Sequence, residues 1–229
     1  MTITQSPIMY TAFDASNILP QTAVKNKLGG QSIPLRYKGE SSYMIQTPTV
    51  SVPFGVSEYT PDAGPTKFSI DLSFKGHEEN PRIKKFMDLF VSLDKHLMNL
   101  AVENSPSWFG KQMSKEVVEE LYRPLIKPSK QPEKYAPTLK LKIRTNRADE
   151  GKLDVHAITN DKTPFDMMSI VPGTTMKAII DIAPIWFVNK QFGTSLTLLA
   201  SEIHSVPSRN WDTFSFQDDD NLVSDSDSA

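Results

Sequence analysis

The longest apolar-rich stretch of the sequence runs from Met176 to Ile203, and it constrains the fold more than any other feature. It is interrupted once, by the turn-like sequence NKQFG. Its many β-branched residues favour strands, and Pro184 argues against a continuous helix because proline lacks an N–H and clashes with the preceding turn. The stretch therefore predicts two strands joined by a short loop at Gly193, with Pro184 at an edge or a bulge. We expect Trp186 to lie in the core.

Length and composition narrow the class of protein. The chain has 229 residues, of which 38% are hydrophobic, and this is enough for a sizeable core. Its 17 prolines favour strands and loops over a helix bundle. It has no cysteine, which excludes disulfides, thiolate zinc sites and cysteine nucleophiles. No apolar run approaches the roughly 20 residues that span a bilayer, and the N-terminus lacks the features of a signal peptide. These features predict a soluble intracellular protein without membrane contact.

Alternation of apolar and polar residues predicts further strands. The clearest are Lys67–Phe74 and Thr138–Thr145, in which every second residue is apolar. Shorter strands are expected at Ser32–Tyr37 and Tyr43–Thr47, which we expect to form a hairpin, and at residues 153–158.

A long helix is predicted from Pro81 to Asn104, because apolar residues recur there every three or four positions and Asn80 is a good N-cap. A short helix is predicted from Ser114 to Tyr122. The chain then contains three strands, two helices and four strands. This order predicts a mainly β domain with inserted helices, in the form of an OB-fold-like antiparallel Greek-key barrel with one long helix after the third strand.

The formal net charge of −2 conceals an asymmetry along the chain. Residues 211–229 contain six Asp and no Lys or Arg; removing these six from the 27 acidic residues leaves 21 against 25 Lys and Arg, a net charge of +4. We therefore expect an N-terminal arm (1–30), an OB-fold-like nucleic-acid-binding domain (31–210) and an acidic, disordered C-terminal tail (211–229). The acidic residues of the tail are Asp212, Asp218, Asp219, Asp220, Asp225 and Asp227.

The strand Thr138–Thr145 turns Lys140, Lys142 and Arg144 to one face. Alternate residues of a strand lie about 7 Å apart, close to the phosphate spacing of an extended single strand. Basic side chains contact phosphates and aromatic rings stack on bases, so this segment predicts single-stranded nucleic-acid binding; the alternative is a solvated sheet face. The candidate binding residues are Lys140, Lys142, Arg144, Arg123, Lys127, Lys130, Lys134, Tyr37, Tyr43 and Tyr135, with Tyr122, Trp108 and Phe109 as further stacking candidates.

The acidic tail has two interpretations. It can simply aid solubility, as many acidic termini do. Alternatively, a tethered polyanion has a high local concentration and can occupy a basic groove until DNA displaces it. Once released, the tail would be free to contact basic patches on partner proteins.

Catalysis has little support in the sequence. The four histidines have no metal-ligand spacing, and the phosphate-loop, dinucleotide-binding and nucleophile-elbow motifs are missing. We expect no enzyme, no cofactor and no metal. Two alternatives stay open: a metal-dependent nuclease using Asp71, Asp154 and Asp181, and a virion or scaffold protein whose tail and helices make protein contacts.

Four segments carry a resemblance to a known family: KFSIDLSF followed by the helix, TLKLKIR, KAIIDIAPIWFVNKQFG, and the acidic terminus. Over residues 32–229 the chain resembles the single-stranded DNA-binding proteins of large nucleo-cytoplasmic DNA viruses, which are related to the replisome single-stranded DNA-binding protein of T-odd bacteriophages. Two features depart from that pattern. The phage proteins end on an aromatic residue whereas this chain ends Ser228-Ala229, and the insert from Trp108 to Pro137 is long.

The resemblance implies an OB-fold and sequence-independent binding of single-stranded DNA in viral replication, recombination or repair. It also implies that the tail contacts viral replication proteins or regulates access of DNA. The protein would then act in an infected host cell, in the nucleus or at a cytoplasmic replication site. A homodimer is an open alternative to a monomer.

Overall fold

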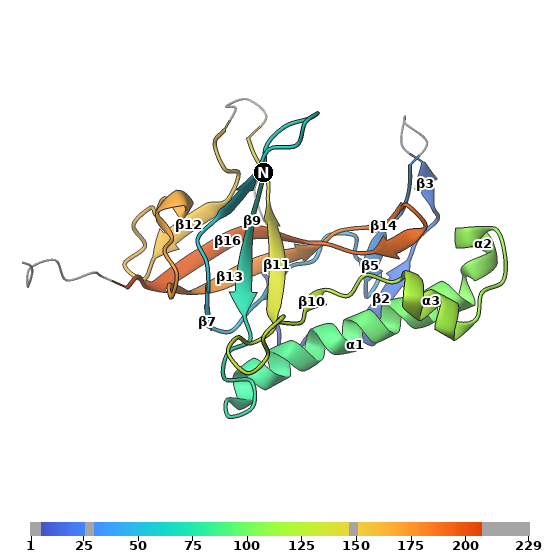
Figure 1. Cartoon of the computed structure of the whole chain (residues 1–229), viewed down its shortest axis with the longest axis horizontal. Helices are drawn as coiled ribbons and strands as arrows, with labels where there is room; N and C mark the ends of the chain where they lie inside the picture. Colours follow the sequence, from blue (N-terminus) through green and yellow to red (C-terminus); the bar gives the residue numbers. More distant parts are fainter. Residues whose placement is uncertain (1–5, 26–29, 147–150, 208–229) are drawn as a thin grey trace, which may run out of the picture.

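Five strands close into a barrel in the structure, a computed structural model that describes residues 6–25, 30–146 and 151–207. Each strand pairs with the next around the ring, and the last pairs again with the first. In ring order they are β7 (Val50–Ser51), β9 (Lys67–Ser73), β11 (Thr138–Ile143), β16 (Leu196–Ser205) and β13 (Thr175–Ile182). Figure 1 shows two of these strands, β9 and β11, crossing the two longest, β13 and β16.

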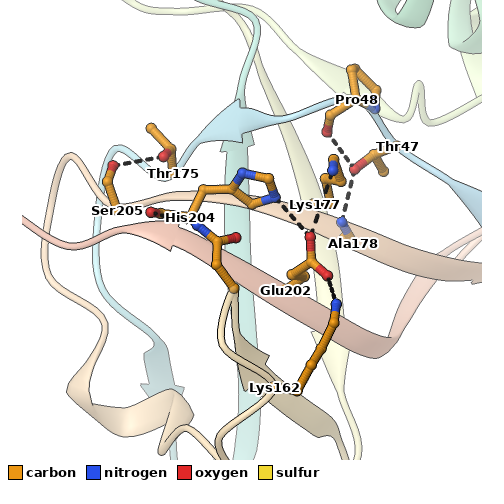
Figure 2. A network of polar contacts seen from close by, with 10 residues as sticks. Thr47, Pro48, Lys162, Thr175, Lys177, Ala178, Glu202, His204 and Ser205 are labelled. Atoms are coloured by element: carbon orange, nitrogen blue, oxygen red, sulfur yellow. Dashed lines mark hydrogen bonds and ion pairs between the residues drawn. The ribbon is translucent and has the colours of Figure 1, made fainter.

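The first strand of the barrel is made of two pieces, because β6 (Ile45–Gln46) also pairs with β13 just before β7. Thr47 joins the pieces: its hydroxyl donates to the carbonyl of Pro48 at 2.8 Å and accepts from the amide of Ala178 at 2.9 Å (Figure 2). If the five barrel strands are numbered by their order along the chain, they follow one another around the ring as first, second, third, fifth and fourth. The third and fifth strands (β11 and β16) are parallel. This Greek-key order is that of an OB-fold, and the predicted fold class is confirmed.

The barrel interior is filled from alternate strand positions. On β11, Leu139 and Leu141 are fully buried, while Lys140 and Lys142 point outward and are exposed. The same alternation, which follows from the pleat of a strand, governs β13. Its buried residues are Met176, Ala178, Ile180 and Ile182.

Three short strands pair with parts of the barrel strands: β8 (Ser57–Tyr59) pairs with β9, β10 (Ile126–Lys127) with β11, and β12 (His156–Thr159) with β16. The 3₁₀ turn η2 (Met167–Ser169) follows β12.

The long helix predicted after the strand Lys67–Phe74 is confirmed as α1 (Pro81–Glu103). Asn80 caps its first turn by accepting a hydrogen bond from the amide of Arg82. In the ring this helix connects the second strand to the third, and it lies along one end of the barrel in Figure 1. The short predicted helix is α3 (Lys115–Leu121), and α2 (Ser105–Phe109) precedes it. None of the helices within the described residues is long and apolar enough to cross a membrane.

The stretch 176–203 is more elaborate than the predicted pair of strands. β13 and β16 do pair antiparallel, but between them lies a second hairpin of β14 (Ile185–Val188) and β15 (Gln191–Gly193). Pro184 marks the exit from β13, because it cannot donate a hydrogen bond to the ladder. The β14–β15 hairpin turns at Asn189 and Lys190, both with positive φ, and β14 joins a separate small sheet.

The N-terminal segments pack differently from the prediction. The expected hairpin of Ser32–Tyr37 with Tyr43–Thr47 is wrong, because their partners come from elsewhere in the chain. β4 (Gln31–Ile33) pairs with β14 and with β3 (Val24–Lys25), β5 (Leu35–Tyr37) pairs with β2 (Ile18–Pro20), and β6 pairs with β13 and with β1 (Ile8–Met9).

Part of the expected N-terminal arm is also packed rather than irregular. Residues 8–25 form β1, the 3₁₀ turn η1 (Ala15–Asn17), β2 and β3, and they bury Tyr10, Phe13 and Ile18 in the core. The expected tail, residues 211–229, lies outside the described residues, and the division at 30 and 210 stays a prediction.

A buried carboxylate fixes the chain that leads from α3 into β10. Asp94 of α1 accepts a hydrogen bond from the Tyr122 hydroxyl at 2.6 Å and another from the Leu125 amide at 3.1 Å. Burial raises the pKa of Asp94 to about 6, although both hydrogen bonds act to lower it. These bonds hold residues 122–127 against the helix, and so they set where β10 meets β11.

We expect Asp94→Asn to remove a pH-dependent component of stability. The folded pKa of about 6 exceeds the ordinary value of 3.8, so wild-type stability from this group is complete below pH 3.8 and is lost as the pH rises through 6. The loss is on the order of 2–3 kcal/mol at 1.36 kcal/mol per pKa unit. Urea unfolding of the wild type and of Asp94→Asn from pH 3.5 to 7.5 measures the difference in their free energies of unfolding. Asp88→Asn, at an exposed carboxylate of the same helix, controls for the change in charge, and a constant Asp94→Asn difference across this range would contradict the assignment.

Candidate nucleic-acid interface

Three exposed cations lie on the outward face of β11 and at the residue directly after it. Lys140, Lys142 and Arg144 alternate with buried Leu139, Leu141 and Ile143, so the predicted alternation of this strand is confirmed. The pairing of β11 with β9 on one side and β16 on the other holds the strand within the wall of the barrel. The three side chains therefore project from a rigid surface.

Neighbouring strands add two cations to this face. Residues paired across antiparallel strands point to the same side, and Thr138 is paired with Lys127 of β10. Lys127 therefore lies on the outward side with Lys140. Lys67 belongs to the outward-facing positions of β9 and interacts electrostatically with Lys142. We call this surface the outer basic face; it consists of Lys67, Lys127, Lys140, Lys142 and Arg144.

The charges on the outer basic face are crowded. Partial desolvation, and next the neighbouring Lys67 ammonium, lower the pKa of Lys142. One carboxylate shares the face: Asp71 is paired with Lys140 across the strands, and one oxygen of Asp71 is buried without a hydrogen bond. Because the Lys67 and Lys142 ammonium groups repel each other, a polyanion laid over both would be bound favourably.

Arg144 reaches across β16 toward β13. Its Nη2 lies 3.5 Å from Oδ2 of Asp181, and their strands are separated by Thr197, which pairs with both Lys142 and Asp181. Burial raises the pKa of Asp181, and the Arg144 guanidinium opposes this shift. This pair links the outer basic face to the outward side of β13.

Exposed aromatic rings lie on the connections that lead into β9 and β11, and one of them is beside the outer basic face. Tyr59 of β8 is 63% exposed and is paired with Lys67, so its ring is on the same side. Phe54, 56% exposed, lies in the same connection between the first and second barrel strands. Neither ring is predicted from the sequence, because no alternation of apolar and polar residues is visible in the proline- and glycine-rich stretch around them. Tyr135, which was predicted, is 63% exposed in the loop before β11.

Two predicted stacking residues are corrected by the structure. Tyr37 and Tyr43 are buried, and both rings stack with Phe13 in the core. Burial raises the pKa of Tyr43, and nearby Asp181 adds to the shift. Neither ring has a free face for a base. The further candidates Tyr122 and Trp108 are buried in the same way, while Phe109 is half-buried against Phe187 and Phe192.

The other predicted cations lie on connecting segments. Arg123 donates from Nε to Oε1 of Gln191 at 2.7 Å, which places it at the β14–β15 hairpin. Trp186 packs near it, and the prediction that Trp186 is a core residue is wrong: it is only half-buried because β14 leaves the barrel. Lys130 and Lys134 are both exposed in the loop between β10 and β11.

The structure does not bring together the three aspartates of the predicted nuclease alternative. Asp71, Asp154 and Asp181 all belong to the described residues, and no three His, Asp or Glu side chains in that part of the chain lie close enough together to hold a metal ion. The three carboxylates therefore do not converge.

Comparison with known proteins places the chain in a family. The model of a family of unknown function, DUF5871, matches residues 75–218, which is more than half of the chain. The chain belongs to DUF5871. In this DUF5871 protein the matched region begins just before α1 and includes β11, β13 and β16. No curated protein matches the chain.

Solved structures of phage proteins are similar in fold to this DUF5871 protein. The crystal structure of gp2.5, a single-stranded DNA-binding protein encoded by bacteriophage T7, matches with a TM-score of 0.50 and 12% identity, over 78% of this chain and 99% of that chain. A single-stranded DNA-binding protein from bacteriophage Enc34, in complex with ssDNA, matches with a TM-score of 0.46 and 13% identity, over 84% and 97% of the two chains. At such low identity the likeness to gp2.5 bears on the fold alone.

Proposed function

We propose that this DUF5871 protein binds single-stranded DNA without sequence preference, through the outer basic face. The observation that carries the proposal is the gathering of five cations on the outward side of the second and third barrel strands and the segment beside them. OB-folds bind oligonucleotides on the face of these two strands and with the loops that border it.

The chemistry of the face suits a phosphate backbone. Lys140, Lys142 and Arg144 repeat about every 7 Å along β11. Lysine and arginine neutralise phosphates and release counterions, which gives affinity without reading bases. The exposed rings of Tyr59 and Tyr135 offer stacking surfaces, and stacking tolerates any base because every base has a π-face. These features support binding that is independent of sequence.

The biological role is part of the same proposal. A protein of this kind would cover single strands during viral DNA replication, recombination or repair in an infected host cell. Its acidic tail, with Asp218, Asp219, Asp220, Asp225 and Asp227, would compete with DNA for the outer basic face and contact replication proteins when released. A homodimer is compatible with this role.

Removing three cations of the face should weaken binding and flatten its salt dependence. For Lys67→Ala/Lys140→Ala/Lys142→Ala we expect a loss of roughly 100-fold in affinity for a labelled oligonucleotide at 0.1 M salt, and a salt slope smaller by about 2, from the slope of about 0.7 per phosphate contact. Fluorescence anisotropy over a salt series measures both quantities.

The matched control is Lys84→Ala/Lys85→Ala/Lys95→Ala, which removes the same charge from exposed positions of α1. Equal losses in the two triple variants would contradict a localised site. Absence of binding by the wild-type and tail-less proteins at low salt, together with a large assembly indifferent to nucleic acid, would favour a virion or scaffold protein instead.

Tyr59→Ala should weaken binding without changing the salt slope, because it removes a ring and no charge. Stacking contributes roughly 1–3 kcal/mol per base, which corresponds to about 5- to 150-fold in affinity. Tyr59→Phe keeps the ring and should bind like the wild type. An oligonucleotide with abasic sites should not distinguish the three proteins; a similar loss on that ligand would refute stacking.

Deleting residues 212–229 should tighten binding at low salt, because the competing polyanion is gone. We expect a gain of several-fold that shrinks as salt rises, since salt screens the attraction between tail and face. Replacing the six tail Asp by Asn in the full chain should reproduce the gain. A tail-less protein with unchanged affinity at all salt concentrations would show that the tail does not compete.

A further inference from the structure

A pocket of about 230 Å³ opens on the outward side of β13, β16 and β12, beyond the end of the outer basic face. Its floor is made of half-buried aliphatic side chains from the three strands: Ile179 is paired with Ala200, and Ile158 is paired with Glu202. His156 and Gln46 stand at its wall. None of these residues has a role in the predicted binding site.

The backbone explains why the sheet is hollowed here. The register between β13 and β16 shifts between Ile179 and Ile180, whose partners are Ala200 and Leu198, so Leu199 has no partner on β13. A bulge of this kind twists the strand and redirects its side chains. The small side chain of Ala200 then leaves the space open above it.

One side of the pocket is held by a network of ions (Figure 2). Glu202 accepts a hydrogen bond from the Lys162 ammonium and lies 3.1 Å from Nε2 of His204 and 3.6 Å from Nζ of Lys177. The hydrogen bond from Lys162 holds the pKa of Glu202 below its usual range, so the carboxylate stays ionised. The wall is therefore fixed in place and carries two lysines against one carboxylate.

The pocket continues the outer basic face. The Arg144 guanidinium lies 3.5 Å from the Asp181 carboxylate, and Ile179 lies two positions from Asp181 on the same side of β13, about 7 Å along that strand. This distance is close to the spacing of nucleotides in an extended strand. A strand with one phosphate held by the Arg144 guanidinium beside Asp181 would therefore place the next nucleotide near Ile179, in the pocket lining.

We propose that this pocket is a subsite for one nucleobase of the bound strand. The inference rests on the proposed function and adds a defined place for a base. The aliphatic floor would contact the ring face, and the His156 imidazole can stack on a base. The Gln46 amide offers both a donor and acceptors to the base edge, so it suits more than one base. The volume lies below the roughly 300–1,000 Å³ of pockets for drug-sized ligands, which fits a single ring system.

Filling the pocket tests the proposal. Ala200→Phe places a ring in the space from an outward-facing position, so the barrel interior is left unchanged. We expect this variant to bind an oligonucleotide roughly ten-fold more weakly, with an unchanged salt slope, and to bind an abasic oligonucleotide like the wild type. Ala200→Ser leaves the pocket open and should match the wild type on both ligands.

The outcomes separate the two proposals. If the wild type binds and the lysine triple variant is weakened, but Ala200→Phe binds as tightly as the wild type, the base subsite is wrong and the proposed function stands. An equal loss on the abasic ligand also overturns the subsite. If Ala200→Phe loses binding of a free mononucleotide but not of the oligonucleotide, the pocket serves a soluble nucleotide instead of a strand.

A second measurement covers the case in which Ala200→Phe misfolds. Photocrosslinking of the wild-type protein to oligonucleotides carrying 5-iodouracil should label peptides of β12 or β13 that contain His156 or Ile179. Labelling confined to other peptides, in a complex that does form, would overturn the subsite.

Discussion

The antiparallel pairing of β13 with β16 is the interaction on which the rest of the structure depends. It closes the ring, because β13 also pairs with the first barrel strand and β16 also pairs with β11. Closure removes the free edges that these strands would otherwise expose. It also brings Thr197 between Lys142 and Asp181, so that a basic strand and a remote carboxylate share one surface.

Helix α1 influences the outer basic face indirectly. α1 packs across one end of the barrel and presents the buried Asp94 to Tyr122 and Leu125. A buried carboxylate is costly unless it is hydrogen-bonded, so the segment that satisfies it is held firmly. That segment continues into β10, whose register turns Lys127 outward beside β11. A polar contact inside the domain thus positions a cation on its surface.

The outer basic face would attract a polyanion, but carboxylates also lie on it. Asp71 and Asp181 lie among the cations, and the Asp181 carboxylate orients Arg144. Farther along the same side, Glu202 balances Lys162 and Lys177 around a pocket with an aliphatic floor. Positive charge is therefore most crowded at Lys67 and Lys142, whereas the pocket at Ala200 has an aliphatic floor beside two lysines and one carboxylate.

The amino-acid sequence alone predicts the strands Lys67–Phe74 and Thr138–Thr145, the capped helix α1 and the charge asymmetry, because each depends on a local period or a local composition. Which aromatic rings are exposed depends on the tertiary structure. Tyr37 and Tyr43 looked like surface residues beside basic ones, yet both stack in the core, whereas Tyr59 is exposed through its pairing with Lys67. Burial and the pocket at Ala200 depend on pairings between distant segments, and no short-range pattern encodes those contacts.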